Sequence, residues 1–494
     1  MMHEHGKSDS PIVPAKPPNE AEPGEAKEAV EGRGLAKGKT PERSVSRTQS
    51  RISMSSALER IRQAARRDKR QRFTALLHHV YSVDSLRAAY FELKRDAAAG
   101  IDGATWRQYG EGLESHLSDL SDRIRRGAYR AQPVRRAYIS KAGEPEKRRP
   151  LGVLVLEDKI VQRATAEVLS SLYEQDFVGF SYGFRPGRSP HQALDALSVG
   201  IMRRKVNWVL DADIRSFFDT LNHEWLVKFI EHRVADRRIV GLIQKWLNAG
   251  VLEQGQHIET EMGTIQGGSI SPLLANLYLH YVFDLWVKQW RKTKARGDVI
   301  VVRLADDFVV GFEHREDGER FLSELAERLK RFGLELHAQK TRLIEFGRHA
   351  EENRRNRGDG KPQTFNFLGF THSCAKTRQG KFVVLRQTMR KRWQAKLKAV
   401  KVELRRRMHT PVPEMGRYVR SVILGHMRYY AVPMNAVSVS DFRIGVARIW
   451  RRVLKRRSQK SHMPWTRMQR YIVRWVPQTH VCHPYPWQRF GVVT

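Results

Sequence analysis

Along the middle of the chain, apolar residues occur either in short continuous runs or at the spacing of an amphipathic helix. Short apolar runs predict strands at Val206–Leu210 and Val299–Leu304, whereas Leu322–Phe332 has the spacing of an amphipathic helix. A polar, basic stretch at Arg348–Lys361 predicts a surface loop, and the apolar run Phe365–Phe370 after it predicts a hairpin. Strands and helices mixed in this way predict an α+β fold.

The two ends of the chain differ from this middle. Residues 1–52 are rich in Pro, Gly, Ser, Lys and Glu and poor in apolar groups, so we expect them to be disordered. The stretch Ala57–Arg72 predicts a basic amphipathic helix, which is either a solvated helix or an RNA-contacting extension. From Leu385 the pattern becomes helical and strongly basic. The predicted segments are residues 1–52, 53–384, 385–475 and 476–494.

Charge narrows the class of partner. Lysine and arginine total 89 against 53 aspartates and glutamates, a net charge of +36 that favours a polyanion such as RNA. No apolar run approaches the roughly 18 residues that a membrane helix needs, and no signal-peptide pattern is present. The two cysteines, Cys374 and Cys482, fit a reducing cytoplasm better than a disulfide framework.

Two of the apolar runs lead into carboxylates. Asp306 and Asp307 follow one strand in a short turn, and Asp211 and Asp213 end another. Side by side, these carboxylates would repel each other and raise their own pKa values unless cations were present. With two Mg²⁺ ions roughly 3.5–4 Å apart, they would form a nucleotidyl-transfer site. An ordinary solvent-exposed Asp-Asp turn is the alternative.

An ordered series of motifs adds a family resemblance. Val299–Phe312 resembles the metal-binding hairpin of reverse transcriptases, usually Tyr-Ala-Asp-Asp in the group II intron family. Further segments that resemble this family, in the expected order, are Ala99–Gly103, Arg149–Val153, Ser181–Ser189, Thr264–Pro272, Gly333–Thr341 and Asn366–Phe370. The resemblance covers roughly residues 56–475. It implies a right-hand polymerase with fingers and palm in 53–384, an all-helical thumb or maturase domain in 385–475 and a C-terminal tail.

The resemblance assigns a metal site. Asp213, Asp306 and Asp307 would coordinate two Mg²⁺ ions, for which Mn²⁺ can substitute, with the backbone carbonyl of Ile214 as a further ligand. Asp211 competes with Asp213 for this role. Phe218, five residues after Asp213, resembles the steric gate that excludes a ribose 2′-hydroxyl.

Other residues would bind the incoming deoxynucleoside triphosphate. Gln266 and Gly267 resemble the nucleotide-site motif, and a glycine lets the backbone approach the substrate. Lys141 and Arg149 would grip the triphosphate, and Lys340 is a candidate proton donor to pyrophosphate. These three cations could instead be ordinary surface charges.

The basic C-terminal helices would lie along a template–primer duplex. Candidate phosphate contacts are Arg390, Arg392, Lys396 and Lys398, although each could belong to a solvated helix face. The implied function is a group II intron-encoded enzyme of the bacterial cytoplasm that copies RNA into DNA and assists splicing and retromobility. Its partners would be an RNA template, a DNA primer, deoxynucleoside triphosphates, structured intron RNA and target DNA, with no membrane.

Some features depart from the family pattern. Leu304 replaces the tyrosine before Ala-Asp-Asp, and Ile265 replaces the proline before Gln-Gly-Gly, which puts primer contact and processivity in question. The spacing of His480, Cys482 and His483 is wrong for structural zinc, and with no Cys-x-x-Cys pair we expect no DNA-cutting activity. Alternative functions are a reverse transcriptase of a CRISPR-associated or defence element and a non-catalytic RNA-binding splicing maturase.

Overall fold

The computed structural model describes residues 55–141, 144–253, 256–258, 262–264, 267–458 and 462–489. The strands are β1 Val134–Lys141, β2 Glu144–Val153, β3 Trp208–Asp213, β4 Val251–Glu253, β5 Gln256–Ile258, β6 Val299–Leu304, β7 Asp307–Phe312, β8 Arg342–Glu345, β9 Phe365–Phe367, β10 Phe370–Lys376 and β11 Phe382–Thr388. They form three sheets with the orders β2-β1-β4-β5, β6-β7-β3-β8 and β11-β10-β9.

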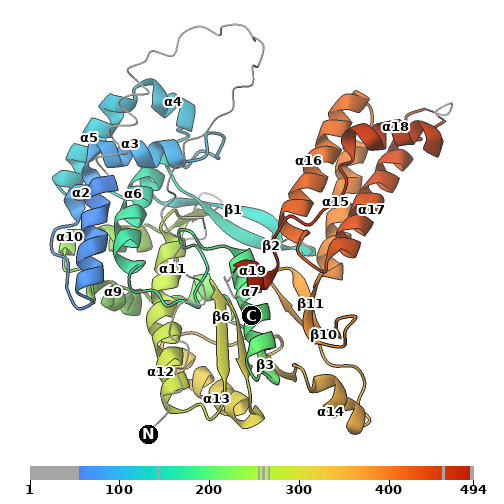
Figure 1. Cartoon of the computed structure of the whole chain (residues 1–494). Helices are drawn as coiled ribbons and strands as arrows, with labels where there is room; N and C mark the ends of the chain where they lie inside the picture. The colour runs from blue at the N-terminus through green and yellow to red at the C-terminus, as the bar shows by residue number, and fades with distance from the viewer. Residues whose placement is uncertain are drawn as a thin grey trace, which may run out of the picture.

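Helices surround these sheets and make up the C-terminal body (Figure 1). A helix at 55–67 comes first. The others are α2 Leu77–Tyr81, α3 Val83–Glu92, α4 Trp106–Glu111, α5 Leu113–Arg125, α6 Leu156–Tyr173, α7 Pro190–Arg203, α8 Phe217–Thr220, α9 His223–Glu231, α10 Arg237–Leu247, α11 Ser271–Leu279, the π-helical turn η1 His280–Asp284, α12 Leu285–Thr293, α13 Arg315–Arg331, α14 Ala350–Asn356, α15 Arg390–Arg406, α16 Val412–Tyr430, α17 Ala436–Leu454, α18 Trp465–Trp475 and α19 Pro486–Arg489. The α+β class expected from the sequence is confirmed. None of the helices in the described part of the chain is both long and apolar enough to cross a membrane.

The sheet β6-β7-β3-β8 is buried on both faces. Because side chains alternate along a strand, Val299 and Val301 of β6 pack with the large core that includes α11 and α13. Ile300 and Val302 face the other way, into a second core shared with α7 and β9–β11. This two-sided burial explains why β6 is an unbroken apolar run, and its predicted bounds are confirmed.

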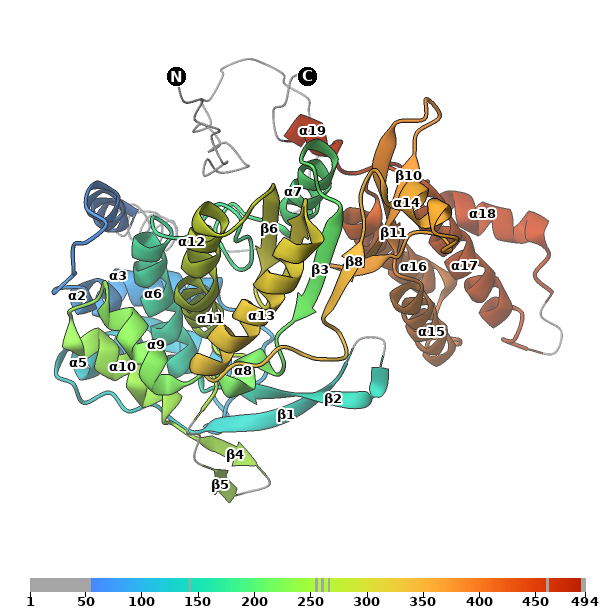
Figure 2. The same ribbon diagram turned by 90° about the horizontal axis from the view of Figure 1, so that it is seen from below.

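The basic amphipathic helix predicted at Ala57–Arg72 is confirmed in its first part: the helix spans residues 55–67 and ends before Arg72. Leu58, Ile61 and Ala65 are buried in the larger core with the helices α2, α3, α5 and α6, while Arg66 and Arg67 on its other side are exposed. From the same part of the molecule, the long hairpin β1–β2 extends toward the C-terminal helices (Figures 1 and 2).

Two sequence-based expectations need correction. The stretch Arg348–Lys361 is not simply a loop, because it contains helix α14, whose buried Ala350 anchors an otherwise polar turn of chain. The helical pattern expected from Leu385 begins only at Arg390, because strand β11 continues to Thr388 and pairs with β10. The predicted hairpin at Phe365–Phe370 is confirmed by the pairing of β9 with β10.

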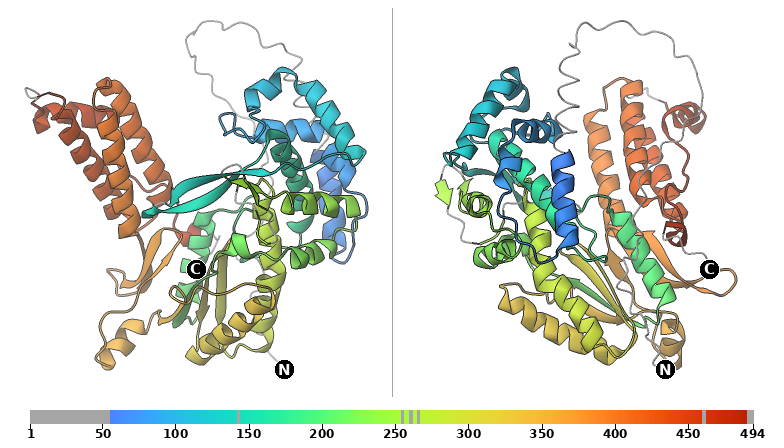
Figure 3. Two further views of the ribbon diagram at one scale, coloured as in Figure 1. Left: turned by 180° about the vertical axis from the view of Figure 1, so that it is seen from behind. Right: turned by 60° about the vertical axis from the view of Figure 1, so that its left-hand side comes forward.

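The C-terminal body has its own core of residues from α15 to α18, including the fully buried Trp450. The chain then returns to the central sheet, where α19 packs against α7 (Figures 1 and 3). Asp195 of α7 marks this junction: its carboxylate lies 2.6 Å from Arg386 of β11 and 2.6 Å from Arg489 of α19. One buried carboxylate therefore joins three segments that are far apart in sequence.

We expect Asp195→Ala to lower the free energy of unfolding by about 3–5 kcal/mol, because it leaves the buried Arg386 guanidinium without its counter-charge. Chemical denaturation followed by circular dichroism would measure the loss. Arg489→Ala removes the more exposed partner and should cost clearly less. Equal effects of the two substitutions would contradict this account.

Candidate active site

Three aspartates meet at one end of the central sheet. Asp213, the last residue of β3, pairs in register with Asp307, the first residue of β7. Asp306 lies between β6 and β7 in a two-residue turn with Ala305, whose φ of 57° is unusual for a residue with a side chain. The structure thus brings together the three aspartates that the sequence singled out.

Asp211 lies on the same face of the sheet as Asp213, because the two are separated by one residue of β3. Its carboxylate is 3.3 Å from the guanidinium of Arg342 on the neighbouring strand β8. Burial nevertheless raises its pKa above the ordinary value. Asp211 is thus paired with the side chain of an adjacent strand, whereas Asp213 lies at the strand end opposite Asp307.

The carboxylates influence each other. Burial raises the pKa of Asp307 to about 7, with further contributions from Asp306 and Asp213, while Arg392 acts in the opposite direction. Mutual repulsion of this kind is expected where carboxylates gather without a counter-ion. The Asp307 side chain nonetheless keeps contact with solvent, so an ion can reach it.

Lys340 supplies one positive charge at this place. Its ammonium group forms an ion pair with the Asp213 carboxylate, and the turn that carries it is anchored by a 2.8 Å bond from the His337 N–H to the Asp213 carbonyl. A second backbone hydrogen bond, of 2.8 Å, runs from the Arg215 N–H to the Glu335 carbonyl. Neither bond uses the carbonyl of Ile214, which was expected to be a metal ligand.

The donor set suits a hard divalent cation, because carboxylate oxygens are the ligands that Mg²⁺ prefers. Among the residues that the structure describes, however, no three metal-ligating side chains already converge on one point. The ammonium of Lys340 is bonded to one of the two carboxylate oxygens of Asp213. The residues fit a divalent cation in kind, and a cation at Asp213 would compete with Lys340 for this carboxylate.

A buried arginine holds the Asp-Asp turn. Arg303 of β6 has a fully buried side chain and makes two bonds, of 2.7 and 2.5 Å, to the carboxylate of the equally buried Asp284. It also donates to the Ala305 carbonyl at 2.9 Å, and to Asn276 and Ser181 at 3.1 and 2.7 Å. The carbonyl of the turn residue before Asp306 is therefore fixed to a charged group inside the core.

The segment Ser181–Ser189 packs directly on this turn. The Tyr182 N–H donates to the Arg303 carbonyl at 2.8 Å, and the side-chain amide of Asn276 donates to the Gly183 carbonyl. A side chain at Gly183 would lie 2.3 Å from the backbone nitrogen of Ala305. Glycine is required here because the two backbones approach so closely.

Two residues expected at the nucleotide site, Phe218 and Gly267, belong to the described part of the structure. Phe218 is half-buried on α8, while Phe217 is in the core, and the carbonyl of Phe218 accepts a 2.7 Å bond from Thr264. Gly267 has a φ of 114°, and a side chain there would lie 2.5 Å from the Gly152 carbonyl. Gly267 thus allows contact with β2, a reason that the sequence did not show.

Three other candidates are only partly described. Gln266, like Ile265, lies outside the described residues. Lys141 and Arg149 belong to the paired strands β1 and β2, but their side chains are outside the described part of the structure. Their roles stay predictions.

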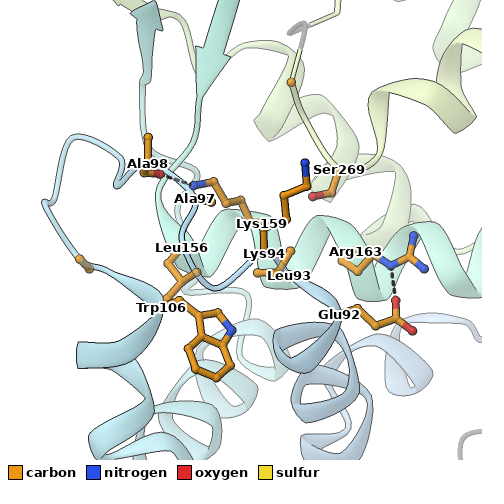
Figure 4. Close-up of a pocket in the computed structure, with 12 residues that line it drawn as sticks. Glu92, Leu93, Lys94, Ala97, Ala98, Trp106, Leu156, Lys159, Arg163 and Ser269 are labelled. Atoms are coloured by element: carbon orange, nitrogen blue, oxygen red, sulfur yellow. Dashed lines mark hydrogen bonds and ion pairs between the residues drawn. The ribbon is translucent and has the colours of Figure 1, made fainter. Parts of the chain in front are cut away.

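A cavity of about 600 Å³ adjoins Gly267 and Ser269 (Figure 4). Lys94, Lys159 and Trp106 also line it, and the ammonium of Lys159 donates to the Ala98 carbonyl at 2.9 Å. The loop that carries the predicted motif Ala99–Gly103 therefore closes one side of a basic cavity next to the candidate nucleotide site.

The four cations proposed to contact phosphate are on helix α15, and all are exposed: Arg390, Arg392, Lys396 and Lys398. Arg392 differs from the others, because its charge acts on the pKa of Asp307 and its guanidinium lies against Gly369. It therefore connects the helical body with the aspartates. His483, one of the residues considered for zinc, stacks on His191 at 3.8 Å and bonds to the Arg428 carbonyl.

Sequence reasoning missed Arg303 and Asp284. A charged residue inside an otherwise apolar strand was the available signal for Arg303, because a buried charge needs a partner. No local pattern identifies Asp284 as that partner, since it ends a π-helical turn in a different segment.

Comparisons with known proteins agree with this geometry. Residues 139–372 match the family model for reverse transcriptases (RNA-dependent DNA polymerases). The chain is 32% identical over 306 residues to the group II intron-encoded protein LtrA of Lactococcus lactis, covering 60% of this chain and 50% of that protein. It is 35% identical over 239 residues to protein YkfC of Escherichia coli, covering 43% of this chain and 62% of that protein.

More distant similarity reaches the nuclear intron maturase 1, mitochondrial, of Arabidopsis thaliana, at 26% identity over 93 residues, 19% of this chain and 13% of that protein. Residues 139–372 are thus similar to reverse transcriptases. The chain is also similar to a group II intron-encoded protein, in agreement with the resemblance that the motifs predicted. It spans about half the length of LtrA.

We expect Arg303→Met to disorganise the Asp-Asp turn. The substitution leaves Asp284 as a buried, unpaired carboxylate and removes the bond to the Ala305 carbonyl, so the free energy of unfolding should fall by about 3–5 kcal/mol. Denaturant melts would measure this. The double variant Arg303→Met/Asp284→Leu removes both charges and should regain most of the stability. A double variant no more stable than Arg303→Met would contradict a paired charge.

Proposed function

We propose that this protein is an RNA-directed DNA polymerase encoded by a group II intron. The observation that carries the proposal is the register of Asp213 with Asp307, next to the turn at Asp306, within a reverse transcriptase domain. Three carboxylates lie at adjoining strand ends, and burial together with the charges of Asp306 and Asp213 raises the pKa of Asp307, so the group is suited to charge neutralisation by divalent cations. The group II intron-encoded relative supports the intron origin.

Asp213, Asp306 and Asp307 would hold two Mg²⁺ ions, with the Ile214 carbonyl as a further ligand. When bound, such ions lower the pKa of the primer 3′-hydroxyl and stabilise the charge of the leaving pyrophosphate. The chain itself would position the reactants. Lys340 would leave Asp213 as the cation arrives and remain close enough to donate a proton to pyrophosphate.

Other residues would select and hold the nucleotide. Phe218 is half-buried on α8, five residues after Asp213, and its ring would collide with a ribose 2′-hydroxyl. Gly267 would lie at the edge of the nucleotide site, where its backbone packs closely against Gly152 of β2. Gln266 would line the same site, and Lys141 and Arg149 of the β1–β2 hairpin would bind the triphosphate.

The described arrangement supports assigning fingers and palm to residues 53–384 and the thumb to 385–475. In this assignment α15 lies along the template–primer duplex and presents its exposed cations to phosphates. Structured intron RNA and target DNA are the further partners that we propose. A bacterial cytoplasmic location, as expected from the sequence, belongs to the same proposal.

A second candidate function is a splicing maturase without polymerase activity. Its support is the ion pair between Lys340 and Asp213, which occupies a ligand that the polymerase needs. One of the relatives is named as an intron maturase. Both functions require RNA binding, so only a catalytic assay separates them.

Primer extension tests the polymerase directly. On an RNA template with Mg²⁺ and deoxynucleotides, we expect the unaltered protein to extend a DNA primer and Asp306→Ala to be slower by about 10²–10³-fold or more, because charge stabilisation is lost. Asp119→Ala, an exposed carboxylate on α5, should extend normally. If the unaltered protein binds RNA tightly but does not extend the primer, the result supports the splicing maturase without polymerase activity.

Mg²⁺ binding should depend on pH. A metal ligand must be deprotonated, and the raised pKa of Asp307 is about 7, so apparent Mg²⁺ affinity should increase roughly tenfold between pH 6 and pH 8. Isothermal titration calorimetry at the two pH values would measure it. Asp307→Asn should bind more weakly and lose most of the pH dependence; an unchanged dependence in this variant would contradict the assignment.

A further inference from the structure

A larger cavity, of about 980 Å³, is lined by residues from the end of the N-terminal helix, from the segment that joins α6 to α7 and from helix α12. Its volume is at the upper end of the roughly 300–1,000 Å³ that small-ligand sites occupy. The buried residues Phe177, Phe180 and His280 form part of its lining. Among the described residues, it shares no lining residue with the candidate metal and nucleotide sites.

Positive charge dominates this cavity. Nine lysine and arginine residues line it against two carboxylates, those of Glu174 and Asp176. Like charges gathered around one space repel each other, and a bound anion relieves this repulsion. The cavity is therefore suited to a ligand with several negative charges.

The two carboxylates are already used within the wall of the cavity. Glu174 pairs with Arg185 at 3.0 Å. Asp176 pairs with Arg233 and with Lys69, each at 3.4 Å. Because Arg185 and Arg233 are buried, these ion pairs hold the wall together. The other cations that line the cavity have no share in them.

Two of these other cations face the cavity from different elements. Arg188 is half-buried at the end of the segment before α7, with its guanidinium 5.3 Å from the centre of the Tyr182 ring. Burial and the charge of Arg185 lower the pKa of Arg188, so its positive charge is in an unfavourable place until an anion arrives. Lys288 of α12 is exposed.

The arrangement of the cations favours a compact anion. A single-stranded nucleic acid is followed along its length by a basic groove, whereas here cations from three separate segments line one cavity. A short chain of phosphates carries several charges in a small volume. Arginine suits such a ligand, because its guanidinium can donate two parallel hydrogen bonds to phosphate oxygens.

His232 and Tyr281 add a flat aromatic surface to the same cavity. Their rings stack with 5.4 Å between centroids and an interplanar angle of 3°, and His232 is exposed. Phe229 stacks on Tyr281 at 5.0 Å and helps to hold that ring in place. An aromatic ring presented in this way can stack with a nucleobase.

We propose that this cavity binds a compact chain of phosphates, carried either by a nucleoside triphosphate or by inorganic polyphosphate. The phosphates would lie among Arg188, Lys288 and the exposed Arg70 and Arg72, and the base of a nucleotide would stack on His232. The site is separate from the one proposed for polymerisation, and it does not depend on the chain being a polymerase.

The test uses the full chain in the presence of EDTA, so that no divalent cation can link a polyphosphate to the three aspartates. Isothermal titration calorimetry at fixed salt and pH measures the dissociation constants of inorganic tripolyphosphate, of ATP and of a short single-stranded RNA. We expect tripolyphosphate and ATP each to bind in a saturable way, with one equivalent per chain.

Substitutions of the two cations locate the binding. Lys288→Glu should weaken tripolyphosphate binding by about tenfold or more, because an attraction becomes a repulsion, and the exposed position should leave the fold intact. Arg188→Gln should also cost about tenfold, and Arg188→Lys, which keeps the charge, should retain part of the affinity. The matched controls Lys330→Glu and Arg130→Gln change exposed residues outside the cavity and should change the affinity by less than about twofold.

His232→Ala distinguishes the two sources of phosphate. If the ligand is a nucleotide, ATP should bind more tightly than tripolyphosphate, and the substitution should remove that advantage, a loss of roughly fivefold for ATP alone. If ATP and tripolyphosphate bind equally and His232→Ala affects neither, the phosphate chain alone is recognised.

Two outcomes would overturn the proposal. The first is tripolyphosphate binding that does not saturate, or that the cavity substitutions weaken no more than the controls do. The second is RNA that binds far more tightly than either compact ligand and loses most affinity through the same substitutions, because the cavity would then belong to an RNA-binding surface. A failure of primer extension would leave these measurements unchanged, since they are made without Mg²⁺.

Discussion

The geometry of the candidate active site depends on the ion pair between Arg303 and Asp284. Two charges without solvent exposure are expensive to bury, and here their cost is offset by a full set of hydrogen bonds to Ala305, Asn276 and Ser181. Each of these partners comes from a segment that borders the Asp-Asp turn. When the core folds, the pair therefore fixes the position of the turn that carries Asp306 and Asp307. An apolar pair of the same size could not do this, because it would make no hydrogen bond to the turn.

The π-helical turn η1 is part of the same arrangement. A π-turn inserts an extra residue into a helix and redirects the side chains after it. It lies between α11, which supplies Asn276, and α12, and it ends at Asp284. Of the two residues on this helix that contact Arg303, Asn276 precedes the irregular turn and Asp284 is its last residue. The π-turn therefore helps to set the direction of Asp284 relative to Asn276.

The sequence predicted the parts of the site that local patterns determine. Strand β6 was placed correctly because two-sided burial leaves an unbroken apolar run, and the aspartates were found because they end such runs. The ion pair of Lys340 with Asp213 and that of Arg303 with Asp284 join residues from different segments, and no spacing rule connects them. Helix α14 was missed because it is short and polar, with only Ala350 buried.

Arginine and lysine side chains have two different tasks in this chain. Arg303 is buried and paired with Asp284, and it fixes the Asp-Asp turn. Arg386 is buried and paired with Asp195, and it fixes the junction between the central sheet and the C-terminal body. Because each charge is neutralised by its partner, neither attracts a nucleic acid at the surface. Most of the cations on α15 are exposed and remain available to a polyanion. Arg392 is one of these exposed cations, and its charge also acts on the pKa of Asp307. The net charge of the whole chain therefore indicates a nucleic-acid partner, but only the placement of individual arginines links that partner to the aspartates.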